Sequence, residues 1–215
     1  GAINGEESND TLFLEETAEI STGGNINLGP DSDQATVRGD IAGTLSLGEG
    51  VDTATWDSAT SSVTGQFLGG EQGNVAVDSN LEVDLVTLEG TGGVLVDLNL
   101  TGGVLDQWEH VTVSEGDWQL DNGGVADDDM VTFTMDGGSF DIPVNDLLSP
   151  ATVNLNGGTL TVDGALELDN PLNMDGGAIE GTGTITGDID ADGGTITPAE
   201  AGTTGELTVD GDLNL

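Results

Sequence analysis

Three aspartates alternate with small apolar residues in the stretch Asp188-Ile189-Asp190-Ala191-Asp192-Gly193. This spacing copies the first half of a calcium-binding EF-hand loop, where oxygen ligands at the first, third and fifth positions precede a glycine. The twelfth position, which supplies a bidentate glutamate in that loop, is Ala199. The pattern makes Asp188, Asp190 and Asp192 candidate Ca²⁺ ligands. The alternative, favoured by the missing glutamate, is three outward carboxylates on an ordinary strand.

A second acidic cluster, Asp127-Asp128-Asp129, stands in an expected loop and is another candidate Ca²⁺ site. Carboxylates are the ligands that hard divalent cations prefer, but a run of three is also typical of a solvated turn. We expect weak cation binding by the whole acidic surface to matter more than one dedicated cage.

The chain has very few of the residues that supply positive charge or a thiol to an active site. It contains one arginine (Arg38), one histidine (His110), no lysine and no cysteine. A lyase acting on acidic sugars needs several cations, and a serine hydrolase of the usual kind needs a Gly-x-Ser-x-Gly turn that is absent. We therefore expect a protein that is not an enzyme. The alternative is a glycan-binding or glycan-hydrolysing protein with a carboxylate pair, held against Trp108 and Trp118.

Charge restricts the partners and the setting. There are 41 acidic residues against one Lys or Arg, which gives a formal net charge of −40. Nucleic acids and anionic membranes need basic residues, so neither is an expected partner, and no apolar run is long enough for membrane insertion. Two carboxylates about 5 Å apart repel by about 0.8 kcal/mol even in water. The charge predicts bound cations or high salt, and thus an extracellular or cell-surface protein of a halophilic or marine source.

A repeat of about 20 residues organises the chain. Each unit holds an Asx-Gly-Gly triplet followed by an alternating apolar stretch, and the first glycines of the four clearest triplets are 20, 19 and 17 residues apart. Glycines allow the left-handed backbone of a sharp corner. The clearest triplets begin at Asp136, Asn156, Asp175 and Asp192.

The strand after each corner alternates between apolar and polar residues, so that Leu160 and Val162 are expected inside and Thr159 and Thr161 outside. The same alternation places Ile185 and Ile189 inside. A second corner, a glycine followed by Asp or Ala and then an aliphatic residue, recurs at Gly39, Gly164, Gly187 and Gly211. A period of about 20 with two corner types is typical of stacked coils. The sequence predicts an all-β, right-handed parallel β-helix (β-solenoid) with about 20 residues per coil. Residues 1–215 would form one domain, most regular over 146–215, with a loop leaving the coil within 50–80.

Four Thr-x-Thr pairs are similar to the threonine ladders of ice-binding solenoids. They begin at Thr132, Thr159, Thr182 and Thr195, so the intervals are 27, 23 and 13 residues. Such unequal intervals do not keep one register, and outward threonine is a good strand residue in any sheet. We therefore expect these four pairs to be ordinary strand residues.

The stretch from Asn154 to Leu215 resembles the passenger repeats of bacterial autotransporters and related surface adhesins, with NGGTLTVDGALEL and ADGGTITPAEAGTTGELTVDGDLNL as the clearest segments. This resemblance implies a parallel β-helix displayed on, or released from, a cell surface. The last repeat carries no polar or helical cap. We expect either a second copy stacked head to tail, giving a filament, or adjoining repeats of a longer chain. The favoured function is structural or adhesive.

Overall fold

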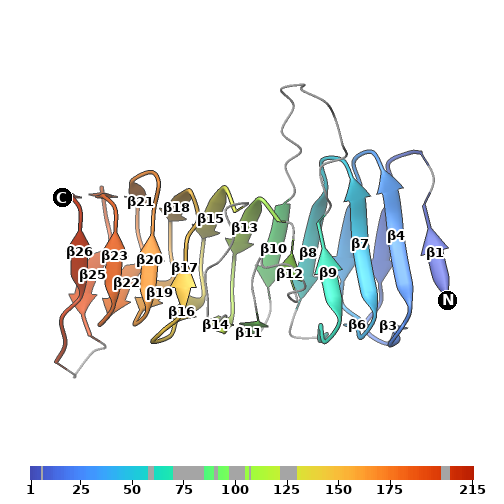
Figure 1. Ribbon diagram of the computed structural model, residues 1–215, viewed down its shortest axis with the longest axis horizontal. Coiled ribbons are helices and arrows are strands. Elements are labelled where there is room, and N and C mark those ends of the chain that lie inside the picture. The colour runs from blue at the N-terminus through green and yellow to red at the C-terminus, as the bar shows by residue number, and fades with distance from the viewer. Residues whose placement is uncertain are drawn as a thin grey trace.

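The described chain is built from parallel strands and contains no helix. In this computed structural model the described residues are 1–5, 7–57, 61–69, 85–89, 92–96, 105–106, 108–121, 130–199 and 204–215. They wind into a β-solenoid of about eight coils with about 20 residues per coil (Figure 1). The predicted fold class is confirmed.

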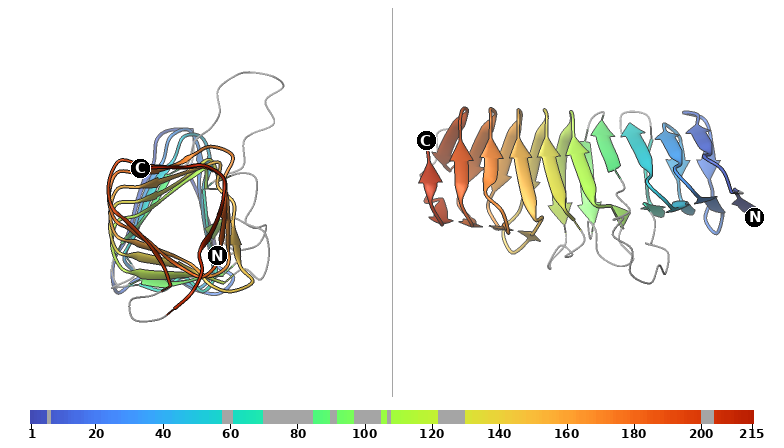
Figure 2. Two further views of the ribbon diagram at one scale, coloured as in Figure 1. Left: turned by 90° about the vertical axis from the view of Figure 1, so that its left-hand side faces the viewer. Right: turned by 90° about the horizontal axis from the view of Figure 1, so that it is seen from above.

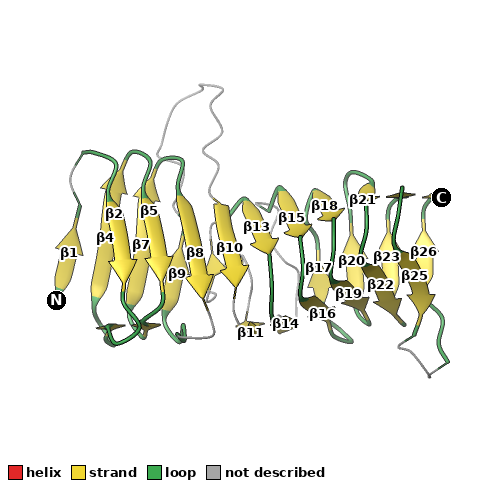
Figure 3. Cartoon of the chain, turned by 180° about the vertical axis from the view of Figure 1, so that it is seen from behind, coloured by secondary structure: helices red, strands yellow, loops and turns green. Residues whose placement is uncertain are grey.

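The longest wall of the solenoid is a ten-stranded parallel sheet, here named the long sheet. It runs through almost every coil. In spatial order its strands are β2 (Thr11–Leu14), β5 (Gln34–Val37), β8 (Thr53–Asp57), β10 (Leu85–Glu89), β13 (His110–Val113), β15 (Thr132–Met135), β18 (Thr152–Leu155), β21 (Leu172–Met174), β24 (Ile189–Ala191) and β27 (Leu213–Asn214). In Figure 3 its strands β2, β5, β8 and β10 face the viewer, and β13, β15, β18 and β21 continue it along the upper edge.

Four smaller sheets complete the walls, and the coils seen end on surround one interior (Figure 2). A five-stranded N-terminal sheet holds β1 (Ala2–Asn4), β4 (Asn25–Pro30), β7 (Thr44–Glu49), β9 (Gln66–Leu68) and β12 (Leu105–Asp106). A six-stranded C-terminal sheet holds β11 (Gly92–Val96), β14 (Asp117–Asp121), β16 (Ser139–Ile142), β19 (Thr159–Val162), β22 (Ala178–Gly181) and β25 (Thr195–Pro198). The remaining strands are β17 (Leu147–Leu148), β20 (Ala165–Glu167), β23 (Thr184–Thr186) and β26 (Thr208–Asp210) in one sheet, and β3 (Glu19–Ile20) with β6 (Asp40–Ile41) in another.

The interior is a single apolar column filled from every wall. Leu160, Val162, Ile185 and Ile189, all expected inside from their alternation, are 0% exposed. Because successive side chains of a strand point to opposite faces, the polar residues between them lie on the outside. The coils therefore stack apolar residue on apolar residue, and most acids lie on the outer face, with Asp33, Asp52 and Asp146 as buried exceptions.

The Asx-Gly-Gly corners have the geometry expected of them. Gly138, Gly158 and Gly177 have φ values of 70°, 75° and 70°, in the left-handed region. A Cβ on Gly157 would lie 2.6 Å from the carbonyl oxygen of Asp136 in the preceding coil. The second glycine thus supplies the backbone conformation, and the first allows the coils to stack closely.

Among the described residues, the range 50–80, within which a loop was expected, contains two strands. Strands β8 and β9 fall inside this range and pair with their neighbours in the long sheet and the N-terminal sheet. Residues 58–60 and 70–80 lie outside the described part. In the residues that are described, no helix could cross a bilayer.

Candidate cation-binding and assembly surfaces

The predicted calcium ligands near the C-terminal coils lie on the outer surface. Asp190 is an outward residue of β24, and Asp188 and Asp192 flank that strand; all three side chains are exposed. Asp190 and Asp192 line a shallow hollow of about 270 Å³ together with Asn214. The structure thus brings two of the three carboxylates to one hollow and leaves Asp188 at the corner before the strand.

Two of these carboxylates already accept hydrogen bonds from the next coil. Asp188 Oδ1 accepts from the backbone N–H of Asp212 at 2.8 Å, and Asp190 Oδ1 accepts from Nδ2 of Asn214 at 2.7 Å. In the described part of the chain, no group of three or more His, Cys, Asp or Glu side chains is arranged to hold a metal ion. Any cation at Asp190 and Asp192 would take its other ligands from neutral oxygens and water. The second predicted cluster, Asp127, Asp128 and Asp129, lies outside the described residues.

Aspartates at the corners tie successive coils together. Asp163 Oδ1 accepts from both the N–H and the hydroxyl of Thr182 at 2.8 Å, and Asp40 Oδ1 accepts from the N–H and the hydroxyl of Ser62 at 2.8 Å. Asp188 caps the following coil in the same way. The sequence identified these corners by their glycines, but this carboxylate role was missed. The Gly-Asp-aliphatic triplets at Gly39 and Gly187 were a signal that could have indicated it for Asp40 and Asp188, whereas Asp163 precedes its corner glycine.

Two aspartates point into the solenoid instead of out of it. Asp33 is 1% exposed and Asp52 is 0% exposed. The Asp33 N–H donates to Asp52 Oδ1, and the Asp10 N–H donates to Asp33 Oδ1, both at 2.7 Å, while Asp33 Oδ2 is buried without a hydrogen-bond partner. Burial raises the pKa of Asp33; the charges of Asp10 and Asp31 raise it further, and the Asp10 hydrogen bond lowers it. Sequence reasoning did not find this column.

The two basic side chains are placed in structural positions. Arg38 Nε lies 3.8 Å from Asp57 Oδ2, and the guanidinium lies 5.7 Å from the centre of the Phe13 ring. His110 is half-buried on β13, and burial lowers its pKa.

The tryptophans expected to hold a sugar are core residues. Trp108 is 0% exposed and Trp118 is 1% exposed. Trp108 packs edge to face on Phe67 and donates to its carbonyl oxygen at 3.1 Å, and Trp118 packs on Trp56. These rings cannot stack on a ligand from solvent without leaving the interior. The glycan alternative therefore loses the aromatic platform on which it depended.

The last described coil presents apolar side chains to solvent. A hollow of about 520 Å³ opens there between β24, β25, β26 and β27. Leu213 is 45% exposed and Leu215 is 92% exposed. The apolar lining of the hollow includes Met174, Ile196, Leu207, Val209, Leu213 and Leu215.

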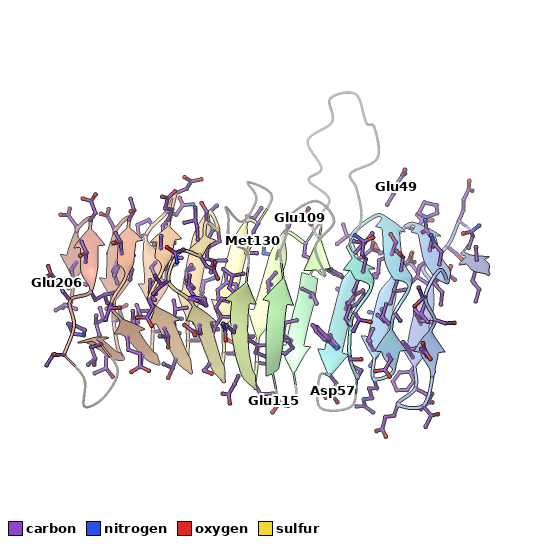
Figure 4. The ribbon with its side chains drawn as sticks, turned by 60° about the horizontal axis from the view of Figure 1, so that its bottom comes forward. Glu49, Asp57, Glu109, Glu115, Met130 and Glu206 are labelled. Carbon is purple, nitrogen blue, oxygen red and sulfur yellow. The ribbon has the colours of Figure 1, made fainter. Side chains whose placement is uncertain are left out.

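Carboxylates are spread along the whole solenoid. In Figure 4 the labelled Glu49, Glu109, Glu115 and Glu206 mark successive positions from the N-terminal to the C-terminal coils. Distributed negative charge of this kind makes the electrostatic potential of the whole surface negative and attracts cations along it.

Comparisons with known proteins give no relative: no protein-family model, curated protein or solved structure matches this chain.

Proposed function

We propose that this chain is a non-enzymatic structural or adhesive β-solenoid of the cell exterior, whose acidic faces bind cations and whose coils continue head to tail. The observation that carries the proposal is the apolar face of the last coil, where Leu213 and Leu215 stand exposed over a hollow of about 520 Å³. A further coil, from a second copy or from adjoining repeats, would cover it in the way that each interior coil is covered by the next.

The other end of the solenoid supports the same arrangement. Strand β1 pairs on one side with β4, and its Ile3 is 63% exposed. An edge strand with free N–H and C=O groups accepts another parallel strand readily. A head-to-tail contact between these two unlike faces propagates without closing, so that it builds a filament.

Cations belong to this proposal because the subunits carry like charge. With a net charge of −40 on each copy, bringing two ends together costs Coulomb energy that only counterions offset. Divalent ions such as Ca²⁺ suit carboxylate oxygens, and Asp190 with Asp192 lies beside the exposed end. Assembly is therefore expected to depend on Ca²⁺ and salt.

Electron microscopy and light scattering of the purified protein, with and without CaCl₂, test the proposal. The wild type should form filaments, and both Leu213→Asp and Ile3→Asp should remain monomeric because each places a charge at one of the two end faces. Val144→Asp is the matched control, since Val144 is 65% exposed but lies at neither end face. Monomers of the wild type at every salt and calcium concentration would refute self-assembly.

A further inference from the structure

Five threonines form one straight column on the outer face of the long sheet. The register pairs Thr36 with Thr55, Thr55 with Thr87, Thr87 with Thr112, and Thr112 with Thr134. Each side chain is half-buried, between buried residues on the same strand. The sequence intervals of 19, 32, 25 and 22 residues hide this register, because chain outside the strands takes up the difference in length.

The column differs from the threonine pairs that the sequence singled out. Of those pairs only Thr132 and Thr134 lie on the long sheet, on β15; Thr159 and Thr195 begin pairs on β19 and β25 of the C-terminal sheet, and Thr184 lies on β23. These pairs form no single ladder, as expected. The ladder that does exist is assembled from strands whose spacing gave no sign of it.

The threonine column and the outward column on one side of it carry no carboxylate from β5 to β15. That second column contains Gln34, Thr53, Leu85, His110, Thr132 and Thr152 in register. Charge begins on the other side of the threonines, where Asp57 ends β8 and pairs with Arg38 at 3.8 Å, Glu89 is in register with Asp57, and Asp136 follows β15. In a chain with 41 acidic residues, two adjacent columns without a carboxylate are a departure from the rest of the surface.

The spacing of the column can be compared with that of a hydrogen-bonded lattice. Parallel strands lie about 4.8 Å apart, so the threonine hydroxyls repeat at about that distance. Tetrahedral water with hydrogen bonds of about 2.75 Å places second-neighbour oxygens about 4.5 Å apart. Over the four intervals the mismatch adds up to about 1 Å, well under half a repeat.

Threonine suits such a lattice for two reasons. Its hydroxyl both donates and accepts, as water does, and its branched Cβ restricts χ1, so that the row is ordered before any ligand binds. Charged groups, which would hold water in other orientations, are missing from the two columns. A sugar lattice would need aromatic platforms, but Trp56, Trp108 and Trp118 are all buried.

We infer that the threonine face of the long sheet, defined by Thr36, Thr55, Thr87, Thr112 and Thr134, binds the surface of ice. The repeat, the absence of carboxylates from the two columns and the ordered hydroxyls each match a neutral crystal of water. This function is independent of head-to-tail assembly, which uses the two ends of the solenoid and leaves the long sheet open.

Thermal hysteresis, the gap between the melting and freezing points of a single ice crystal, tests the inference. The wild type should show a gap and should shape the crystal, whereas Thr112→Tyr should lose most of the gap because the ring lifts the face away from the lattice. Thr134→Tyr is a second variant at the neighbouring coil and should behave in the same way. Each variant is first shown by circular dichroism to melt as a folded protein.

Thr161→Tyr is the matched control. Thr161 is also an outward, half-buried threonine, but it lies on β19 between Asp141 and Glu180 and outside the column. It should retain the wild-type gap, and so should Leu213→Asp, which blocks only end-to-end contact. The inference is overturned if the wild type shows no gap, or if Thr161→Tyr loses as much as folded Thr112→Tyr or Thr134→Tyr.

Discussion

Replacing Asp33 by Asn should stabilise the protein near neutral pH. Asp33 is 1% exposed, and its Oδ2 is buried without a hydrogen-bond partner. Asparagine keeps the Oδ1 that accepts from the Asp10 N–H at 2.7 Å and removes the charge. The substitution therefore isolates the cost of a buried carboxylate from the loss of a coil-to-coil hydrogen bond.

The size of the effect follows from the stacking distance. Two carboxylates on adjacent coils lie about 4.8 Å apart, so they repel by about 1 kcal/mol in water and about 3 kcal/mol at an effective dielectric of 20. The new amide N–H₂ remains a buried polar group and offsets part of the gain, by about 1 kcal/mol or more. We expect a net stabilisation of about 1 kcal/mol, which raises the Tm by about 2–4 °C in a domain of this size.

The pH dependence gives a second signature of the same residue. Burial raises the folded-state pKa of Asp33, so the native state takes up a proton before the unfolded state does. The wild type should therefore gain stability as the pH falls through the folded-state pKa towards the ordinary value of about 3.9, and Asp33→Asn should lack this contribution. The advantage of the variant should be greatest above that window and should shrink within it.

Thermal unfolding followed by circular dichroism, in low salt with EDTA, measures both effects. Asp169→Asn is the control, because it removes the same charge from an exposed position. The prediction is refuted if the Tm of Asp33→Asn is below that of the wild type, or no higher than that of Asp169→Asn. Other interactions would then offset the cost of burying the Asp33 carboxylate.

Two further predictions concern the corners and the surface charge. Gly158→Ala should lower the free energy of unfolding by about 1–3 kcal/mol, since φ is 75° and the new Cβ would lie 2.5 Å from the Gly138 carbonyl oxygen. Gly23→Ala is the control: its φ is 77° but the space around the Cβ is open, so the free energy of unfolding should fall by less. Urea unfolding of both variants compares them. The net charge of −40 should make the Tm rise with NaCl and rise further at equal ionic strength with CaCl₂; a Tm that does not change with salt would contradict the role given to charge repulsion.

The fold could be predicted from the sequence because its determinants are local. Asx-Gly-Gly corners and period-2 alternation need only neighbouring residues, and they placed Leu160, Val162 and Ile189 in the core and Gly158 at a left-handed corner. The strand boundaries within residues 50–80 were harder to predict from the sequence. The local pattern within residues 50–80 is weak and did not indicate β8 and β9, which are strands because they pair with neighbouring coils.

For the candidate sites too, the local pattern suggested residues, and contacts between coils decided where their side chains lie. Local spacing suggested Asp188, Asp190 and Asp192 as ligands, but the structure gives two of these carboxylates hydrogen bonds to the next coil, a partner about 24 residues away. Trp108 and Trp118 would have formed the platform that the glycan alternative needed, yet both lie in the core. Whether a side chain faces solvent or a neighbouring coil depends on contacts that a local pattern does not contain.

The sequence by itself determined that this chain stacks coils about 20 residues apart, places most acids outside and turns on glycine, because corner geometry and alternation are properties of a few adjacent residues. Only the tertiary structure decided which residues stand above one another. Thr36, Thr55, Thr87, Thr112 and Thr134 fall into one column although their intervals range from 19 to 32 residues. The physical reason is that strand pairing fixes the register coil by coil, while chain outside the strands absorbs any difference in length.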